Sequence, residues 1–382
     1  MQKVTKTRSI QNSNTIDMPL LITVLMLLAL GIVMVLSASA PSALAEYGDS
    51  YKYVKRQGGA AVAGIGLLLF LSRFNYKRLK KLYVPIYIFS ILVLFTVLIP
   101  GIGNEVNGAK RWINLFGLGL QPSEITKIGL IIFYAGYFTD PNNKLDTFKG
   151  NTLIPIGALA LPIIILFKVQ NHMSAGVVIA MVTAIIIFMS GCKLKYYYTI
   201  LGGGAALGIL MFPLIKDKII GGFRSGRIKA WRSPFDDPTG TAYQTIQGLY
   251  AIASGGLFGV GLGQSTQKHL YIPEAHNDFI FAILAEELGF IGCAVILILF
   301  AVFTIRGILI SVRADDMFGS LIAIGITSLI AIQAALNIAV VTNTIPNTGI
   351  SLPFLSYGGT SLIILLSSVG VLLNISRTAK KI

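Results

Sequence analysis

Residues 18–39 read MPLLITVLMLLALGIVMVLSAS and contain no charged side chain. A helix needs about 20 mostly apolar residues to cross the hydrocarbon core of a bilayer. The run is therefore predicted to be a transmembrane helix. Residues 1–17 before it are polar, and no small-residue cleavage site follows the run. We expect the run to act as an anchor, with residues 1–17 as a cytoplasmic N-terminal tail.

The composition of the whole chain extends this prediction. Of its 382 residues, 54% are apolar and only 12% are charged, and the mean hydropathy is +0.75. A soluble domain carries about 25% charged residues, so this chain must be partly surrounded by lipid. Two cysteines in or beside apolar runs exclude a disulfide scaffold, and three histidines are too few for a metal centre. The composition predicts a polytopic integral membrane protein without a metal site built from cysteine or histidine.

Nine further apolar runs follow the first. The ten runs lie near residues 18–39, 57–72, 82–99, 121–138, 152–169, 174–191, 197–215, 277–305, 318–342 and 357–376. We therefore predict an all-α polytopic membrane protein with ten transmembrane helices, in which residues 18–382 form one membrane domain.

The basic residues predict the orientation of these helices. With both termini in the cytoplasm, seventeen basic residues fall in cytoplasmic segments and five in the short outer loops near 40–56, 100–120 and 343–356. The positive-inside rule favours this arrangement. One large extracellular loop, about residues 216–276 between helices 7 and 8, carries seven more. Long loops are partly exempt from the rule, so we attribute the net charge of +15 to orientation and anionic lipid, not to nucleic acid.

Residues 268–289, KHLYIPEAHNDFIFAILAEELG, hold the strongest candidate for chemistry. Asp278 lies where the extracellular loop meets an apolar helix, after Glu274 and His276. On a continuous helix a stripe of small residues would share its face and admit a closely packed neighbour. The stripe comprises Ala282, Ala285, Gly289 and Gly292. Asp278 could act as a general base or only as a helix N-cap, and both interpretations stay open at this point.

Glu286 and Glu287 lie about two turns deeper in the same predicted helix. Acids within a membrane are costly, and they are usually functional or paired. We favour a structural or helix-pairing role for both.

Two other clusters of polar residues flank apolar runs. Gln121, Pro122, Ser123 and Glu124 open the fourth run, and Glu124 and Lys127 are spaced to form an i, i+3 ion pair. Arg111, in the loop before them, is suited to holding a phosphate.

The third cluster, residues 342–359, reads TNTIPNTGISLPFLSYGG. Non-helical backbone at membrane depth is tolerated where protein buries it or where it lines a cavity. Its polar groups, among them Ser356 and Tyr357, could therefore bind a sugar, or the segment could be a packed re-entrant turn.

Five segments follow one another along the chain: NGAKRWIN at 107–114, QPSEITK at 121–127, SPFDDPTGTAYQTIQGLYAIASGGLFGVGLGQSTQK at 233–268, PEAHNDFIFAILAEELGFIG at 273–292 and PNTGISLPFLSYGG at 346–359. In this order they resemble the SEDS family, the FtsW, RodA and SpoVE proteins of bacterial cell-wall synthesis. The sequences of these segments resemble the FtsW and SpoVE branch more closely than RodA. One departure is QNHMSA at 170–175, where the family commonly reads QPDLGT, so that His172 replaces the usual family aspartate.

The resemblance implies a peptidoglycan glycosyltransferase that polymerises lipid II at the outer face of the cytoplasmic membrane of a bacterium. The essential aspartate of the family falls on Asp278, which would be the catalytic base. The residues we expect to bind the substrate are Arg111, Gln121, Ser123, Glu124, Lys127, Arg227, Lys268, Glu274, His276, Ser356 and Tyr357. The cations Arg111, Arg227 and Lys268 would stabilise the leaving pyrophosphate.

The resemblance also implies partners and leaves other questions open. A class B penicillin-binding protein would supply the transpeptidase, beside other divisome or elongasome proteins. No cofactor is implied firmly, and a divalent cation, Mg²⁺ or Mn²⁺, at the pyrophosphate stays open. The sequence does not distinguish division, cell shape (elongation) and sporulation. The rival functions are a lipid II flippase or transporter, favoured by broken helices and intramembrane acids, and a non-catalytic scaffold, which would need no acid at Asp278.

Overall fold

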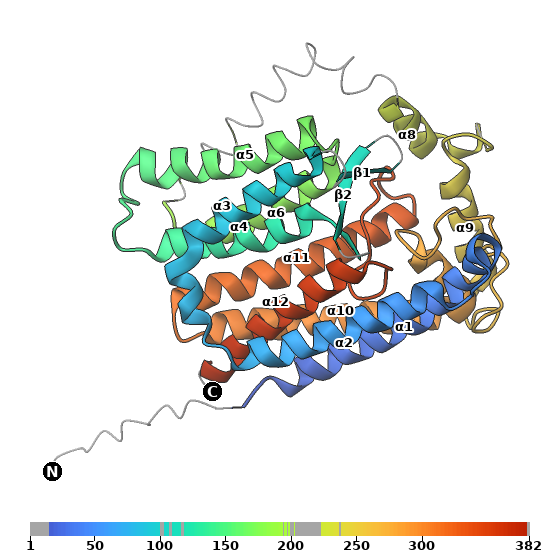
Figure 1. Ribbon diagram of the computed structural model, residues 1–382, viewed down its shortest axis with the longest axis horizontal. Helices are drawn as coiled ribbons and strands as arrows, with labels where there is room; N and C mark the ends of the chain where they lie inside the picture. The colour runs from blue at the N-terminus through green and yellow to red at the C-terminus, as the bar shows by residue number, and fades with distance from the viewer. Residues whose placement is uncertain are drawn as a thin grey trace.

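Long helices running side by side form most of the molecule in this computed structural model (Figure 1). The structure describes residues 15–99, 103–106, 109–115, 118–193, 195, 196, 198, 202, 223–236 and 238–379. The α-helices there are α1 (Met18–Tyr47), α2 (Lys52–Arg73), α3 (Tyr83–Phe95), α4 (Pro122–Thr139), α5 (Ile154–Lys168), α6 (Met173–Met189), α8 (Phe223–Arg232), α9 (Tyr243–Gly255), α10 (Ile280–Arg313), α11 (Met317–Val341) and α12 (Gly359–Thr378). Short η segments are η1 (Tyr76–Leu82), η2 (Thr96–Leu98), η3 (Lys149–Leu153) and η4 (Pro234–Asp236).

Helices lie at nine of the ten predicted spans, and the remaining span, 197–215, falls mostly outside the described residues. Within those residues, seven helical segments are long and apolar enough to cross a membrane. They are Met18–Tyr47, Lys52–Arg73, Tyr76–Leu98, Lys149–Lys168, Ile280–Arg313, Met317–Val341 and Gly359–Thr378. The mostly helical, multi-span architecture is thus confirmed.

The short outer loops differ from the prediction in two places. The loop predicted at 40–56 is only residues 48–51, because α1 continues through Pro41 to Tyr47 and α2 begins at Lys52. The segment 100–120 contains a three-stranded antiparallel sheet of β1 (Gly103–Val106), β2 (Ala109–Leu115) and β3 (Leu118–Leu120). The prediction of an all-α protein is therefore wrong for this small part of the chain.

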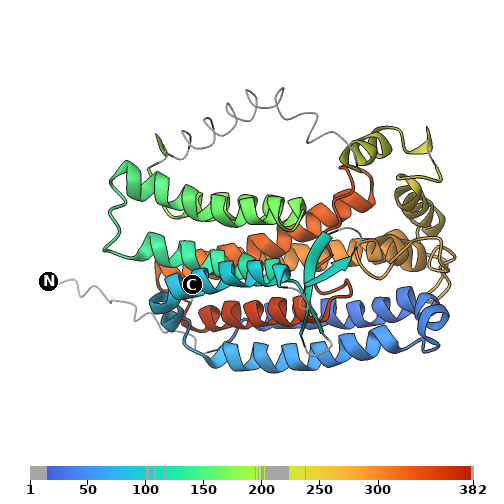
Figure 2. The ribbon, with the colours of Figure 1, turned by 45° about the horizontal axis from the view of Figure 1, so that its top comes forward.

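The predicted loop 216–276 is partly helical where the structure describes it. It contains α8 and α9, which lie with the sheet towards one end of the bundle (Figures 1 and 2). The opposite end holds the start of α1 and the end of α12, where the backbone N–H of Asp17 donates to Ser376 Oγ over 3.0 Å. Both ends of the described chain therefore lie on one side of the bundle.

Helix α10 is broken at Gly289, whose φ of 65° and ψ of −165° are not helical. The predicted continuous stripe of small residues is therefore wrong beyond Ala285. Before the break, α9 approaches closely, since a Cβ on Gly255 would lie 2.0 Å from the carbonyl oxygen of Ala285. Small residues do allow close packing at this contact.

The non-helical segment between α11 and α12 packs into the bundle. Leu352, Phe354 and Leu355 are buried, and the carbonyl of Phe354 contacts α1 at Gly31. This part of the segment is the packed re-entrant turn that the sequence left as one alternative.

Replacing Gly31 with alanine is expected to destabilise the protein by about 1–3 kcal/mol, because its Cβ would lie 2.2 Å from Phe354 O and backbone must move. Gly66→Ala in α2 is the matched control, since nothing lies within 4 Å of that position. Thermal unfolding in detergent measures both. Equal unfolding temperatures for the two variants would contradict the close α1 contact.

Candidate functional site

Asp278 lies just before α10 in the turn that leads into the helix. The helix begins at Ile280, and its N-cap residue, Phe279, makes no side-chain capping hydrogen bond. The N-cap interpretation of Asp278 is therefore wrong. Its carboxylate faces the segment between α11 and α12, since a Cβ on Gly349 would lie 3.6 Å from Asp278 Oδ2.

The side chain of Asn337 on α11 fixes both segments that meet at Asp278. Its Nδ2 donates to the backbone oxygens of Asp278 and Ile350, each over 2.7 Å. Asn337 is fully buried, and its amide supplies both carbonyls with a hydrogen-bond donor. Asn337 was not among the predicted site residues, although an amide within an apolar helix was the available signal.

The surroundings of Asp278 favour its neutral form more than water does. Burial raises the pKa of the Asp278 carboxyl to about 6, against the opposing effect of the Arg227 guanidinium. Arg227 lies on α8 and donates from Nη1 to the carbonyl of Asn347 over 3.0 Å. A carboxylate with a pKa near 6 is suited to accepting a proton near neutral pH.

A second guanidinium lies close enough to Arg227 to sense its charge. Arg111 on β2 donates from Nε to Gln170 O and from Nη2 to Asn171 O, over 3.2 and 2.7 Å. Burial, and then the charge of Arg227, lower the pKa of Arg111. Two neighbouring guanidiniums form a favourable environment for an anion such as a phosphate.

His172, where the family resemblance led us to expect an aspartate, lies directly before α6. It is buried, and its Nδ1 has no hydrogen-bond partner among the described residues. Burial and the charges of Arg111 and Lys127 lower the pKa of His172 to about 3. The imidazole is therefore neutral near pH 7 and does not replace the negative charge of an aspartate.

The predicted ion pair at the start of α4 is confirmed. Lys127 Nζ lies 2.7 Å from Glu124 Oε1, and both side chains are buried. Gln121 precedes the helix, and Ser123 Oγ is buried with no hydrogen-bond partner among the described residues. Substrate binding by these four residues stays a prediction.

The other predicted binding residues lie in two segments that contact each other. Glu274 and His276 belong to the turn before Asp278, and Ser356 and Tyr357 belong to the segment before α12. The ring of His276 lies 5.5 Å from that of Tyr357, whose backbone N–H donates to His276 O. Burial lowers the pKa of His276 to about 4, and Glu274 Oε2 lies 3.6 Å from its Nε2. Ser356 Oγ accepts from the backbone N–H of Leu352 and so closes a turn.

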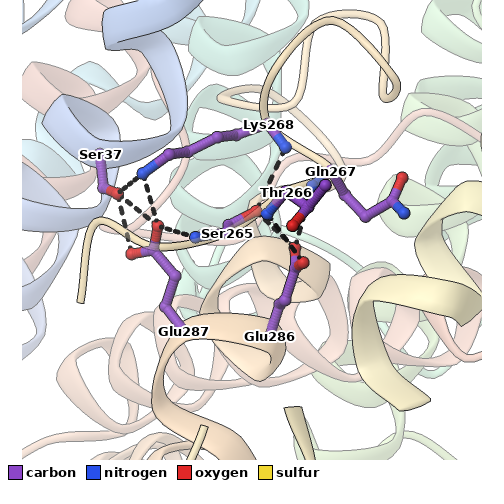
Figure 3. Close-up of polar contacts among 7 residues, drawn as sticks. All are labelled: Ser37, Ser265, Thr266, Gln267, Lys268, Glu286 and Glu287. Atoms are coloured by element: carbon purple, nitrogen blue, oxygen red, sulfur yellow. Dashed lines mark hydrogen bonds and ion pairs between the residues drawn. The ribbon is translucent and has the colours of Figure 1, made fainter. Parts of the chain in front are cut away.

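Lys268 lies in different surroundings from those we expected. It is 5% exposed, and its Nζ contacts Glu287 Oε1 over 2.9 Å and Ser37 Oγ over 3.1 Å (Figure 3). A buried and paired ammonium reaches a lipid phosphate only by leaving its partner. Phosphate binding by Lys268 remains a prediction, but these contacts favour a structural role.

A polar cavity of about 140 Å³ lies beside Arg227. Its lining comprises Arg227, Ala230, Trp231, Thr241, Gln244, Thr245, Asn343 and Asn347. Trp231 and Gln244 were not among the predicted site residues, since their approach to the segment before α12 depends on tertiary structure. Within the described residues, no group of three His, Cys, Asp or Glu residues could hold a metal ion.

The chain is similar to known proteins over nearly its whole length. The family model FTSW_RODA_SPOVE, described as "Cell cycle protein", matches residues 18–381. The "Probable peptidoglycan glycosyltransferase FtsW" of Geobacter sulfurreducens is 39% identical over 95% of this chain and 96% of its own length. The "Stage V sporulation protein E" of Bacillus subtilis is 39% identical over 95% of this chain and 98% of its own length.

Two solved structures share the fold. A chain from a peptidoglycan synthase complex, described as coordinating polymerization and crosslinking, has a TM-score of 0.77 and 28% identity over 95% of this chain and 98% of that one. The rod shape determining protein RodA of Thermus thermophilus has a TM-score of 0.68 and 25% identity over 96% and 98%. From the family match and these relatives, the chain belongs to the FtsW/RodA/SpoVE family.

Proposed function

We propose that this protein is a peptidoglycan glycosyltransferase that polymerises lipid II into glycan strands. The observation that carries the proposal is the position of Asp278, a carboxyl with a raised pKa beside the guanidinium of Arg227. Relatives with 39% identity are named as peptidoglycan glycosyltransferase FtsW and as a sporulation protein. These names do not distinguish a role in division, cell shape or sporulation.

Each charged side chain has a separate role in the proposed reaction. Asp278 accepts the proton of the acceptor 4-hydroxyl while that oxygen forms a bond to the anomeric carbon of the donor. The bond from the anomeric carbon to the pyrophosphate oxygen breaks, and undecaprenyl pyrophosphate leaves with the electron pair. Arg227 and Arg111 stabilise the added negative charge on the leaving group. A divalent cation, Mg²⁺ or Mn²⁺, would add to this stabilisation if one binds with the substrate.

The proposed setting is the outer face of the bacterial cytoplasmic membrane. Ten spans with both termini in the cytoplasm place α8, α9 and Asp278 outside, where lipid II is polymerised. A class B penicillin-binding protein is the proposed partner, beside other divisome or elongasome proteins. The similarity to a chain from a complex that couples polymerization and crosslinking supports this pairing.

A lipid flippase is the second candidate. It is favoured by a cavity of about 450 Å³ at the other end of the bundle, lined in part by Lys77, Lys80 and Asp316. A flippase needs polar groups near both membrane faces.

Asp278→Asn is expected to abolish polymerisation of lipid II while leaving folding and lipid binding intact, because only the proton acceptor is lost. General-base loss costs about 10²–10⁴-fold in rate. The measurement is glycan synthesis from labelled lipid II by purified protein, with and without a class B partner. Asp146→Asn, at an exposed ion pair with Lys193, is the matched control. Near wild-type synthesis by Asp278→Asn would remove Asp278 from the mechanism and leave Glu274 as the next acid to test.

The rate should depend on pH through the same carboxyl. The base must be ionised, and its pKa is raised to about 6, so kcat/KM should fall below about pH 6 and level off above it. Because the charge of Arg227 lowers the pKa of Asp278, Arg227→Gln should move this acidic limb to higher pH. An acidic limb near pH 4, the ordinary range of a carboxyl, would contradict the assignment.

The topology can be tested by cysteine labelling in intact cells. In a Cys192→Ser, Cys293→Ser background, Gly240→Cys should react with an impermeant thiol reagent and Arg78→Cys should not. Permeabilised cells provide the control for reactivity at both sites. Labelling of the Arg78 position in intact cells would overturn the proposed orientation.

A further inference from the structure

A cluster of buried charged residues outside the proposed reaction comprises Lys268, Glu286 and Glu287. Burying an ion costs several kcal/mol unless partners replace its water. Figure 3 shows how these partners are arranged around the two carboxylates. Both acids are paired, in keeping with the structural or helix-pairing role that we favoured for them.

Glu287 joins α10 to α1 and to the segment before Asp278. Its carboxylate accepts from Ser37 Oγ over 2.6 and 2.8 Å and from Lys268 Nζ over 2.9 Å. Ser37 belongs to α1, and its hydroxyl also lies 3.1 Å from Lys268 Nζ. The charge of Lys268 is therefore directly compensated by Glu287.

Glu286 binds the backbone of the same segment. Its Oε1 accepts from the N–H of Thr266 over 2.9 Å, and its Oε2 accepts from the N–H of Gln267 over 3.4 Å and from Ser265 Oγ. Ser265 N–H also lies 3.4 Å from Glu287 Oε1. Consecutive backbone donors of the segment are thus directed at the two carboxylates.

These contacts close the chain on itself around Asp278. The segment leaves the carboxylates at Lys268, passes through Asp278, and returns along α10 to Glu286. The break at Gly289 adds a second connection, since Val260 N–H donates to Glu286 O and Phe290 N–H donates to Gly256 O, each over 2.9 Å. Residues 265–287 therefore form an arch whose two ends are held together.

Taking Asp17 as the level of one membrane surface, we expect the base of the arch near the level of the other. Ser37 follows Asp17 by 20 residues, which corresponds to about 30 Å of helix, the thickness of the hydrocarbon core. At the other end, Asp17 pairs with Arg306 of α10. Helices α1 and α10 are thus joined by polar contacts near both surfaces.

We propose that Lys268, Glu286 and Glu287 form a latch of positioning residues that holds the arch and so orients Asp278 for proton transfer. The inference rests on the proposed glycosyltransferase function. It assigns Lys268 to Glu287 rather than to the substrate pyrophosphate. A displacement of about 1 Å at a reacting group can cost about 100-fold in rate, so loosening the base of the arch should be visible in kcat.

A double-mutant cycle separates the latch from a phosphate contact. The variants are Lys268→Met, Glu287→Gln and the combination of both. Each single change leaves a buried charge without its partner, so kcat should fall about 10- to 100-fold with KM for lipid II nearly unchanged. The double variant has neither charge and should regain most of this loss. Lys55→Met, which breaks the exposed pair with Asp49, is the matched control.

A phosphate ligand at Lys268 predicts the opposite pattern. KM would rise in Lys268→Met, and the double variant would be no better than that single variant, which would overturn the latch. If Lys268→Met does not fold, kcat and KM of the double variant are compared with those of Glu287→Gln, and this comparison distinguishes the latch from a phosphate contact. The latch requires a higher kcat in the double variant, whereas a phosphate contact requires a higher KM.

Hydrogen exchange provides a readout that is independent of activity. Amides of residues 265–279 should exchange faster in Glu287→Gln than in wild type and recover protection in the double variant. Unchanged exchange of this segment in Glu287→Gln would refute the latch even if the enzyme is active. If wild type makes no glycan from lipid II, the proposed function fails, and the exchange experiment still decides whether the latch holds the segment.

Discussion

Hydrocarbon supplies no hydrogen bonds, so every polar group at membrane depth needs a partner within the protein. The break in α10 at Gly289 illustrates the consequence. The freed backbone groups around it are satisfied by residues 256–261, which follow α9 in the chain. A Cβ on Gly289 would lie 2.3 Å from Gly259 N. The break therefore depends on a close backbone contact that glycine permits, and it fixes the end of α9 against α10.

The same requirement brings the candidate site together. Asn337 satisfies carbonyls from two segments and thereby holds the turn of Asp278 beside the residues before α12. Arg227 reaches this region from α8, and Arg111 reaches it from β2. Apart from α11 and the segment that directly follows it, these elements are not adjacent in sequence. The site thus exists only because polar contacts between helices fix the ends of several separate segments.

The sequence predicted features that depend on local pattern. Apolar runs located the helices, and the i, i+3 spacing predicted the pair of Glu124 and Lys127, since both follow from helix geometry. It could not predict that α1 passes through Pro41, that a sheet forms around Arg111, or that Lys268 is buried. These depend on contacts far apart in sequence. The prediction of a stripe of small residues was wrong beyond Ala285 because it assumed a continuous helix. The non-helical backbone torsions of Gly289 interrupt that helix.

The central claim is that the lipid substrate is held beside Asp278 by the charges of α8 and β2. Photo-crosslinking with a lipid II analogue that carries a diazirine near the pyrophosphate tests it directly, with adducts mapped by mass spectrometry. The account predicts adducts in α8 and in residues 343–349, in competition with unlabelled lipid II. Adducts confined to the cavity near Lys77 and Lys80 at the opposite end would contradict it and would favour lipid transport.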